Sequence, residues 1–168
     1  MTTIRLITPA DLPAIITIQD SCYSDALFEA PELLNQRVTA QPQSCWLAEN
    51  NAKHVLAYLL SYPAMIGDIA PLGSPFKQVV NANTLYLHDM AVDNRARGLG
   101  LAQQLLQQAQ QFAVALGLSR LALVAVQGSV PYWQRNGFST VAVTSDQGQQ
   151  ALHSYTGQQA VYMQKPLI

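Results

Sequence analysis

The segment that decides the fold is LYLHDMAVDNRARGLGLAQQLL, residues 85–106. It begins with alternating apolar and polar residues, a pattern that indicates a strand. From residue 102 onward, apolar residues recur at spacings of three and four, which indicates an amphipathic helix ending at Gly117. Its apolar face is formed by Ala102, Leu105, Leu106, Ala109, Phe112, Ala113 and Leu116. The segment therefore predicts a strand that turns directly into a helix.

The turn between these two elements has the composition of an anion site. Gly98 and Gly100 lie beside Arg95 and Arg97, just before the helix. The first N–H groups of a helix have no partner within it, and the helix dipole favours negative charge there. Glycine lacks the Cβ atom that would keep an anion away from these amides, and arginine side chains add bidentate donors. We therefore expect the turn to bind phosphate.

Two common phosphate motifs do not fit this turn. A P-loop requires Lys-Ser or Lys-Thr after the second glycine, where this chain has Leu101 and Ala102. A dinucleotide fingerprint requires a third glycine near Gln103 and an acidic residue about 20 positions later, where the chain instead reaches Val126-Gln127. The remaining pattern is Arg95-x-x-Gly98-x-Gly100 behind a strand that ends in MAV.

The composition of the whole chain narrows the class of protein. Its 168 residues predict one domain, residues 1–168, and its net charge of -1 argues against nucleic-acid or membrane partners. Cys22 and Cys45 are too few for a disulfide framework and lack metal-ligand spacing, so we expect no metal site. Neither a signal peptide nor a membrane-spanning run is evident, and we expect a soluble, cytoplasmic protein.

The expected elements follow the order β-α-α-β-β-β-α-β-α-β-β. Strands are predicted at 3–8, 44–50, 54–62, 85–92, 120–126, 137–143 and 159–167. Helices are predicted at 8–23, 31–39, 101–116 and 129–136. Residues 63–83 form a long connection, which is uncommon without a function, and a polar loop precedes the last strand. The order indicates an α/β (α+β) fold with a mixed sheet of six to seven strands and about four helices.

The arginine-glycine pattern resembles the acetyl-CoA signature of the GNAT superfamily of N-acetyltransferases, Q/R-x-x-G-x-G/A. The resemblance covers most of the chain, because YWQRNGF at 132–138 is similar to the family's FYxxxGF and the order of elements matches. Within the superfamily, YLHDMAV, VPYWQRNGF and the long connection look like the arylalkylamine (serotonin) N-acetyltransferase group. The resemblance implies a GNAT fold and an acetyl-CoA-dependent N-acetyltransferase that releases CoA.

The resemblance also implies where the cofactor lies. Backbone groups of Met90, Ala91 and Val92 are expected to pair with the pantetheine arm as an added strand would. The amides of Arg97, Gly98, Leu99, Gly100 and Leu101 are expected to hold the pyrophosphate. The side chains of Arg95 and Arg97 either contact phosphate or are ordinary surface arginines, and Trp133 is expected to border the cofactor.

Amine acetylation needs a proton acceptor, because deprotonating an alkylamine of pKa ~10.4 at neutral pH costs about 4–5 kcal/mol. Tyr86 and His88 are two residues apart, so alternation along a strand predicts that they share one face with Met90 and Val92. In the arylalkylamine group, two histidines at these positions form a proton route. Here only His88 matches, with Tyr86 as a relay, and the alternative is a structural histidine. Asp89 is expected on the opposite face as a structural residue, and His54 and His153 at the surface.

The family's general-acid tyrosine lies four residues before the glycine of GF. Here that residue is Trp133, which cannot act as an acid near neutral pH, and Tyr132 precedes it. Tyr132 is predicted to reach the sulfur only if its helix is rotated or shifted; otherwise it is a core or rim aromatic. A thiol pKa near ~8.5 lets the sulfur leave largely as thiolate, so a missing acid need not abolish activity.

The acceptor is expected to be a small-molecule primary amine, such as an arylalkylamine or a polyamine. An aromatic acceptor pocket is predicted from Tyr23, Phe28, Tyr62, Phe76 and Trp133, and an ammonium contact from Asp25, Glu29 or Asp68. The alternative is that these are scattered core and surface residues. Two other functions stay open: acetylation of protein N-termini or side chains, and a non-catalytic acyl-CoA-binding domain, which the Trp133 replacement suggests. Self-association as a homodimer is also left open.

Overall fold

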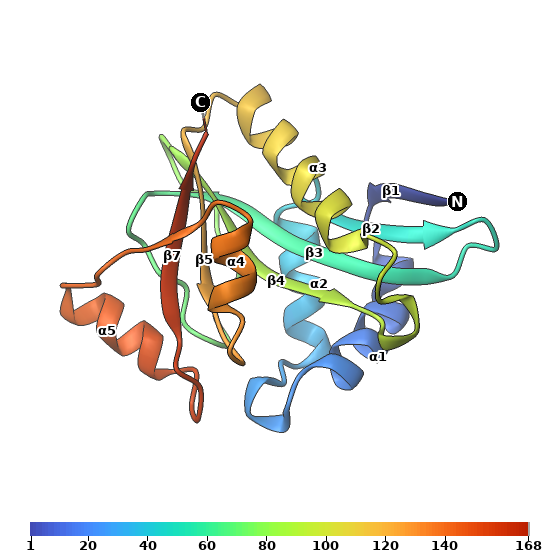
Figure 1. Cartoon of the computed structure of the whole chain (residues 1–168), viewed down its shortest axis with the longest axis horizontal. Helices are drawn as coiled ribbons and strands as arrows, with labels where there is room; N and C mark the ends of the chain where they lie inside the picture. The colour runs from blue at the N-terminus through green and yellow to red at the C-terminus, as the bar shows by residue number, and fades with distance from the viewer. Residues whose placement is uncertain (168) are drawn as a thin grey trace.

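The computed structural model describes residues 1–167, which contain a seven-stranded sheet in the order β1-β2-β3-β4-β5-β7-β6 (Figure 1). The β4–β5 pair is parallel, and every other neighbouring pair is antiparallel. The strands are β1 (Thr2–Leu6), β2 (Cys45–Asn50), β3 (Val55–Ala64), β4 (Thr84–Val92), β5 (Arg120–Ala125), β6 (Ser139–Thr140) and β7 (Val161–Pro166). The predicted mixed sheet and α/β class are confirmed.

Five α-helices lie within the described residues: α1 (Leu12–Cys22), α2 (Pro31–Ala40), α3 (Leu101–Ala115), α4 (Val130–Arg135) and α5 (Asp146–His153). Figure 1 shows α3 and α4 in front of the sheet and α1 and α2 behind it. A 3-10 turn leads into α1, and it is capped by a Thr8–Asp11 capping box in which the Asp11 carboxylate accepts from the Thr8 amide. No helix in residues 1–167 combines the length and apolar character needed to cross a bilayer.

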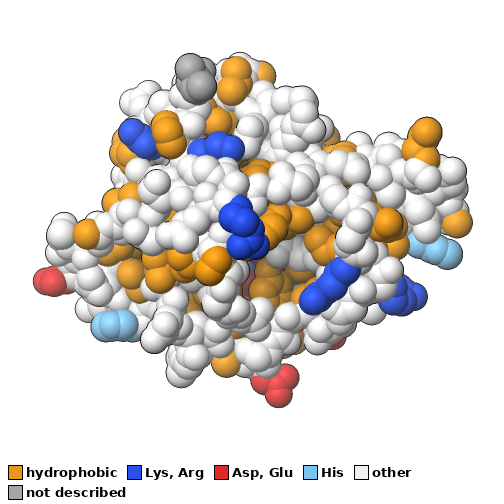
Figure 2. Space-filling model, in the orientation of Figure 1, with side chains coloured by type: hydrophobic (Ala, Val, Ile, Leu, Met, Phe, Trp, Pro, Cys, Tyr) orange, Lys and Arg blue, Asp and Glu red, His pale blue; other side chains and the backbone are white. Residues whose placement is uncertain are grey.

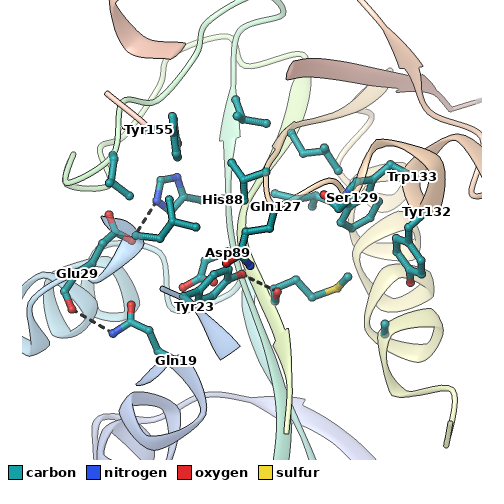
Figure 3. A pocket seen from close by; sticks show the side chains of 18 residues that line it. Gln19, Tyr23, Glu29, His88, Asp89, Gln127, Ser129, Tyr132, Trp133 and Tyr155 are labelled. Atoms are coloured by element: carbon teal, nitrogen blue, oxygen red, sulfur yellow. Dashed lines mark hydrogen bonds and ion pairs between the residues drawn. The ribbon is translucent and has the colours of Figure 1, made fainter. Parts of the chain in front are cut away.

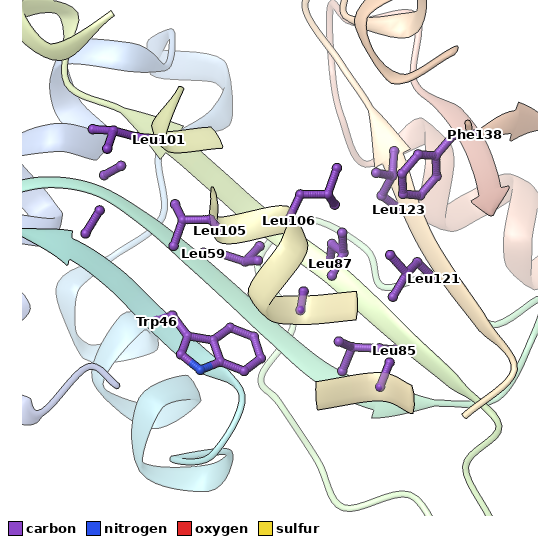
Figure 4. Close-up of a cluster of buried hydrophobic side chains, with 14 of the residues drawn as sticks. Trp46, Leu59, Leu85, Leu87, Leu101, Leu105, Leu106, Leu121, Leu123 and Phe138 are labelled. Atoms are coloured by element: carbon purple, nitrogen blue, oxygen red, sulfur yellow. The ribbon is translucent and has the colours of Figure 1, made fainter. Parts of the chain in front are cut away.

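The apolar face of helix α3 packs against the front of the sheet. Leu105, Ala109 and Ala113 are fully buried against the side chains of β2, β3, β4 and β5 (Figure 4). The other face of the sheet packs on α1 and α2 through a second cluster that includes Ile15, Leu34 and Tyr58. Because both faces are covered, the central strands are apolar on both sides. This packing holds the ends of β4 and β5 in fixed positions.

The two central strands separate partway along their length. Strand β4 pairs with β5 only from Thr84 to Leu87, opposite residues 120–123. Beyond Leu87, β4 continues to Val92 without β5 beside it, while β5 stays paired with β7 as far as Ala125. The sheet is therefore split on its carboxyl-terminal side, between β4 and β5.

A β-bulge at His88 changes which side chains share a face of β4. Strand β3 pairs Leu60 with Asp89 and Ser61 with Leu87, so His88 has no partner residue on β3. Leu87 and Met90 both pack on the α3 side, whereas Tyr86 packs in the cluster on the α1 and α2 side. The prediction that Tyr86 and His88 share one face with Met90 and Val92 is therefore wrong, because the bulge reverses the alternation.

Two other expectations differ from the structure. Residues 146–153, expected to be loop, form α5, whose start is capped by the Ser145 hydroxyl accepting from the Gly148 amide. The strand expected at 137–143 is reduced to β6, two residues long. The connection 65–83 is long and without regular structure, as predicted.

Candidate functional site

The split between β4 and β5 opens into a cleft of about 320 Å³. Its walls come from the end of α1, the loop before α2, the diverging strands, α4 and Tyr155 (Figure 3). Figure 2 shows a hollow in this face of the molecule, with hydrophobic side chains inside it and lysine or arginine side chains beside it. The fold thus places this cleft where β4 and β5 diverge, between the end of α1 and α4.

The open edge of β4 offers backbone groups to this cleft. The Asp93 amide donates to the Leu56 carbonyl of β3 (2.8 Å), and the residues that bond to one neighbour alternate along a strand. Met90 and Val92 therefore direct their peptide groups to the other edge. Their carbonyls accept from the Tyr23 hydroxyl (2.8 Å) and the Cys22 thiol (3.1 Å). Each carbonyl oxygen has a second lone pair, so an extended molecule can still pair with this edge.

The turn after β4 contains the two glycines in the left-handed region of backbone space. Gly98 has φ +82°, and Gly100, the N-cap residue before the 15-residue helix α3, has φ +74°. A Cβ atom added at either position would meet nothing within 4 Å, so the space before the amides is open. Glycine is required here for the backbone conformation as well as for the access predicted from the sequence.

The two arginines of the turn differ. Arg95 pairs with Asp93 through a 2.8 Å contact and keeps 83% of its side chain exposed. The Arg95 guanidinium also holds the pKa of the Asp93 carboxyl below its usual range. Arg97 is exposed and makes no ion pair within residues 1–167. Arg97 is therefore the arginine whose guanidinium is free to meet an anion.

His88 lies on the α2 side of the cleft with its side chain only 2% exposed. Its Nε2 is 3.5 Å from Glu29 Oε1 (Figure 3). Phe76 packs edge-on against the ring, with the ring centroids 5.6 Å apart. Its Nδ1 is buried without a hydrogen-bond partner among the described residues. Burial by itself would raise the pKa of the Glu29 carboxyl, but hydrogen bonds from Arg37 and His88 hold that pKa far below its usual range. An ionised carboxylate therefore stands beside the imidazole.

Asp89 also lines the cleft, where the sequence suggested only a structural residue on the opposite face. Its Oδ2 accepts from the Tyr58 hydroxyl (2.9 Å), while its Oδ1 is buried without a partner. Burial raises the pKa of this carboxyl. The sequence carried no signal for this placement, because it follows from the bulge.

Helix α4 presents Tyr132 and Trp133 to the other wall of the cleft (Figure 3). Their rings meet edge-on at 5.0 Å, and Trp133 packs against Phe138 at 5.3 Å. The Tyr132 hydroxyl is buried and has no partner in the described chain, and burial raises its pKa. Both residues therefore border the cleft.

Buried polar atoms without partners concentrate in this cleft. Four such side-chain atoms occur in residues 1–167, and three of them belong to lining residues: His88 Nδ1, Asp89 Oδ1 and Tyr132 Oη. The fourth is the hydroxyl of Tyr86, which is buried outside the cleft. Because buried polar groups are nearly always paired in folded proteins, the three atoms mark places for a ligand or water.

The structure brings together only part of the predicted acceptor pocket. Tyr23 and Glu29 line the cleft. Phe28 is 50% exposed and outside it, and Phe76 is buried behind His88. The other predicted acceptor residues also lie elsewhere: Tyr62 and Asp68 line a separate cavity, and Asp25 is exposed. Tyr155 and Leu72 also line the cleft but were not predicted, since both lie in segments without a periodic pattern.

Comparison with known proteins gives a family and a fold. A model described as the acetyltransferase (GNAT) family matches residues 12–138. No curated protein matches the chain at a significant level.

Similar solved structures include Ard1 from Thermoplasma volcanium, with 16% identity, a TM-score of 0.73, and 99% and 98% of the two chains covered. GphF, a GNAT-like decarboxylase in complex with isobutyryl-CoA, has 17% identity, a TM-score of 0.75, and 99% and 100% covered. The ribosomal-protein-S18-alanine N-acetyltransferase from Escherichia coli has 19% identity, a TM-score of 0.69, and 99% and 94% covered. At these identities the likeness shows the shared fold.

Proposed function

The chain belongs to the acetyltransferase (GNAT) family, and on that premise we propose that it transfers an acetyl group from acetyl-CoA to a primary amine. The observation that carries the proposal is a cleft lined by a buried, unpartnered imidazole and by the open part of β4, which leads along the chain to the two-glycine turn before α3. Such a path suits a long, phosphate-ended cosubstrate with its acceptor beside the imidazole.

The cosubstrate fits the residues along β4 and the turn after it. The peptide groups of Met90 and Val92 would bind the pantetheine arm, and the amides from Arg97 to Leu101 would bind the pyrophosphate. The open space before Gly98 and Gly100 supports this assignment, as does the free guanidinium of Arg97. Met90, Ala102 and Trp133 line the part of the cleft between these groups.

Bound acetyl-CoA supplies a thioester carbonyl that a neutral amine can attack directly. The chain's task is then to take a proton from the ammonium form of the acceptor. His88 is assigned this role, because its Nδ1 is buried, unpartnered and part of the cleft wall. Tyr86 is a weaker candidate for a relay, since its hydroxyl lies outside the cleft and its ring centroid is 6.2 Å from that of His88.

On the opposite wall, Tyr132 is the residue assigned to the leaving sulfur. Its hydroxyl is buried and unpartnered in the cleft, so it can donate to a thiolate. Trp133 shapes the wall, since its indole packs on Phe138 and has no acidic proton near neutral pH. Because a thiol of pKa ~8.5 leaves largely as thiolate, the contribution of Tyr132 is modest.

The acceptor is proposed to be a small amine with an aromatic or extended apolar group. Tyr23, Leu27, Leu72 and Tyr155 supply mostly apolar surface at the end of the cleft that His88 borders. The YLHDMAV segment favours the arylalkylamine type of acceptor. The alanine N-acetyltransferase among the similar structures makes a protein N-terminus the main competing acceptor.

An assay of CoA release from acetyl-CoA with a panel of acceptors tests the proposal. We expect arylalkylamines and long-chain amines to be turned over faster than short hydrophilic amines. Turnover of N-terminal peptides alone would assign the chain to protein acetylation. Tight binding of acetyl-CoA without turnover of any acceptor would instead favour the non-catalytic acyl-CoA-binding domain.

A further inference from the structure

Three groups surround the carboxylate of Glu29, which lies just before α2. The two terminal guanidinium nitrogens of Arg37, Nη1 and Nη2, each donate to it at 2.6 Å, and the Gly73 amide donates to Oε2 at 2.8 Å. The third group is the imidazole of His88, whose Nε2 is 3.5 Å from Oε1. The geometry leaves Glu29 no freedom to turn away from the imidazole.

Arg37 is itself fixed on every side. Its side chain is fully buried, it donates twice to the Ser74 carbonyl (2.7 and 3.1 Å), and its guanidinium lies over the Phe76 ring at 5.3 Å. Phe76 in turn packs edge-on against His88. The long connection 65–83 is thus anchored through Arg37 to the same carboxylate and the same imidazole.

We propose that Glu29 is a positioning residue that fixes the tautomer of His88, with Arg37 and residues 73–76 holding Glu29 in place. An acceptor-only carboxylate 3.5 Å from Nε2 favours the ring proton on Nε2. The lone pair is then on Nδ1, the buried nitrogen without a partner. When Nδ1 takes a proton from the amine, the resulting imidazolium lies beside a carboxylate that stabilises it. The inference deepens the proposed function and rests on it for the catalytic role.

The other ionisable groups near His88 do not supply this restraint. Asp89 and Tyr86 are on the same strand, and Tyr155 lines the same cleft. Asp89 bonds to Tyr58, and Tyr155 donates to the Ala70 carbonyl (2.8 Å). Tyr86 contributes a ring whose hydroxyl is unpartnered. Within the described chain, Glu29 is the only acidic residue with a carboxylate oxygen within 4 Å of an imidazole nitrogen of His88.

The first experiment reads the tautomer directly and needs no substrate. Long-range ¹H–¹⁵N spectra of histidine-labelled protein at about pH 8 distinguish a proton on Nε2 from one on Nδ1. The exposed His54 and His153 provide internal references. We expect one tautomer for His88, protonated on Nε2. A proton on Nδ1, or an equal mixture in the wild type, would overturn the inference.

The second experiment removes the carboxylate without leaving a buried charge behind. Glu29→Gln alone would leave the buried guanidinium of Arg37 without a counter-charge, so it is combined with Arg37→Met. A carboxamide can donate or accept, so the Nε2 preference should be lost. Should the double variant not fold, Glu29→Asp keeps the charge but withdraws it from the ring by one methylene, and it should weaken the preference. An unchanged tautomer in whichever variant folds would overturn the inference.

Kinetics with the best amine of the panel separate positioning from substrate binding. For the variant that folds, kcat should fall roughly 10- to 100-fold while KM for the amine stays within about 2-fold. Glu49→Gln, which breaks an ion pair with Arg5 on a strand away from the cleft, is the matched control and should keep wild-type values. A rise in KM at constant kcat would make Glu29 an ammonium-binding residue and reject the positioning role. If no amine is turned over, the proposed function fails, and the tautomer spectra still decide the role of Glu29.

Discussion

At position 88 the chain carries an imidazole that is nearly inaccessible to water yet unpartnered at Nδ1. If this nitrogen takes the amine proton, His88→Ala should lower kcat by about 10²-fold or more, the usual range for losing a general base. His54→Ala, at an exposed histidine, is the control. Steady-state rates with a common amine compare the two variants. A wild-type rate in His88→Ala would leave only water or another group as the acceptor.

Acid pH should lower the wild-type rate, since an imidazole must be neutral to accept a proton. The amine's own ionisation extends the rise in rate to higher pH, so the profile alone does not identify the base. The difference between the pH–rate profiles of wild type and His88→Ala gives the contribution of the imidazole to the pH dependence.

Tyr132 and Trp133 are adjacent in the sequence and both border the cleft. We nevertheless expect their substitution to change different kinetic constants. Tyr132→Phe removes the buried hydroxyl and should reduce kcat by a few-fold to about 10-fold, because the thiolate leaves without much help. Trp133→Phe keeps an aromatic ring and should mainly change KM. Initial rates over a range of acceptor concentrations give both constants. A larger loss of kcat in Trp133→Phe would reverse these assignments.

At the scale of elements, the start of α3 is the test of cosubstrate binding. Gly100→Glu adds a side chain and a negative charge in front of the open amides, so acetyl-CoA affinity should fall at least 100-fold. Gly117→Glu, at the other end of α3, has a similar φ of +75° and the same open surroundings. It is therefore a control for backbone strain. Calorimetric titration of both folded variants measures the difference, and equal affinities would remove this turn from the site.

The elements with strong periodicity could be predicted from the sequence, and the others could not. Helix α3 and strand β4 were predicted because each carries its burial pattern in its own residues. Helix α5 was missed because it buries only Gly148 and Ala151, so tertiary contacts rather than an apolar face stabilise it. The bulge at His88 was missed because its cause is the pairing with β3, which no local pattern records.

The same distinction applies to the site. The glycine-arginine turn and His88 lie within one continuous segment and could be predicted together. The partners of His88 come from elsewhere in the chain: Glu29 is 59 positions earlier and Phe76 is on the connection. Aromatic composition suggested Phe28 and Tyr62 as pocket residues, but composition does not say which side of a loop or strand a ring occupies.

For the molecule as a whole, the Glu29–Arg37 pair predicts sensitivity to acid. The pKa of Glu29 is lower in the folded chain than its unfolded value of ~4.3. Such a carboxyl stabilises the fold fully above ~4.3 and loses that contribution as the pH falls further. Urea unfolding at pH 7 and at about pH 3.5 should show a loss of stability that is smaller in Glu29→Gln/Arg37→Met. An equal loss in both proteins would assign the acid sensitivity to other carboxyls.

The split sheet has a consequence for how the molecule opens. Within the sheet, strands β1–β4 are joined to strands β5–β7 by only four residue pairs, between β4 and β5. Because so few residue pairs join the two half-sheets, strands β5–β7 can unfold locally while strands β1–β4 stay folded. The backbone amides of the two halves can then exchange hydrogen with solvent at different rates. A cosubstrate bound between β4 and β5 would contact both halves of the sheet. At a concentration 100 times its Kd it would raise the free energy of unfolding by about 2.7 kcal/mol. Hydrogen exchange should then slow in both halves to a common rate, and unfolding should become a single sharper transition.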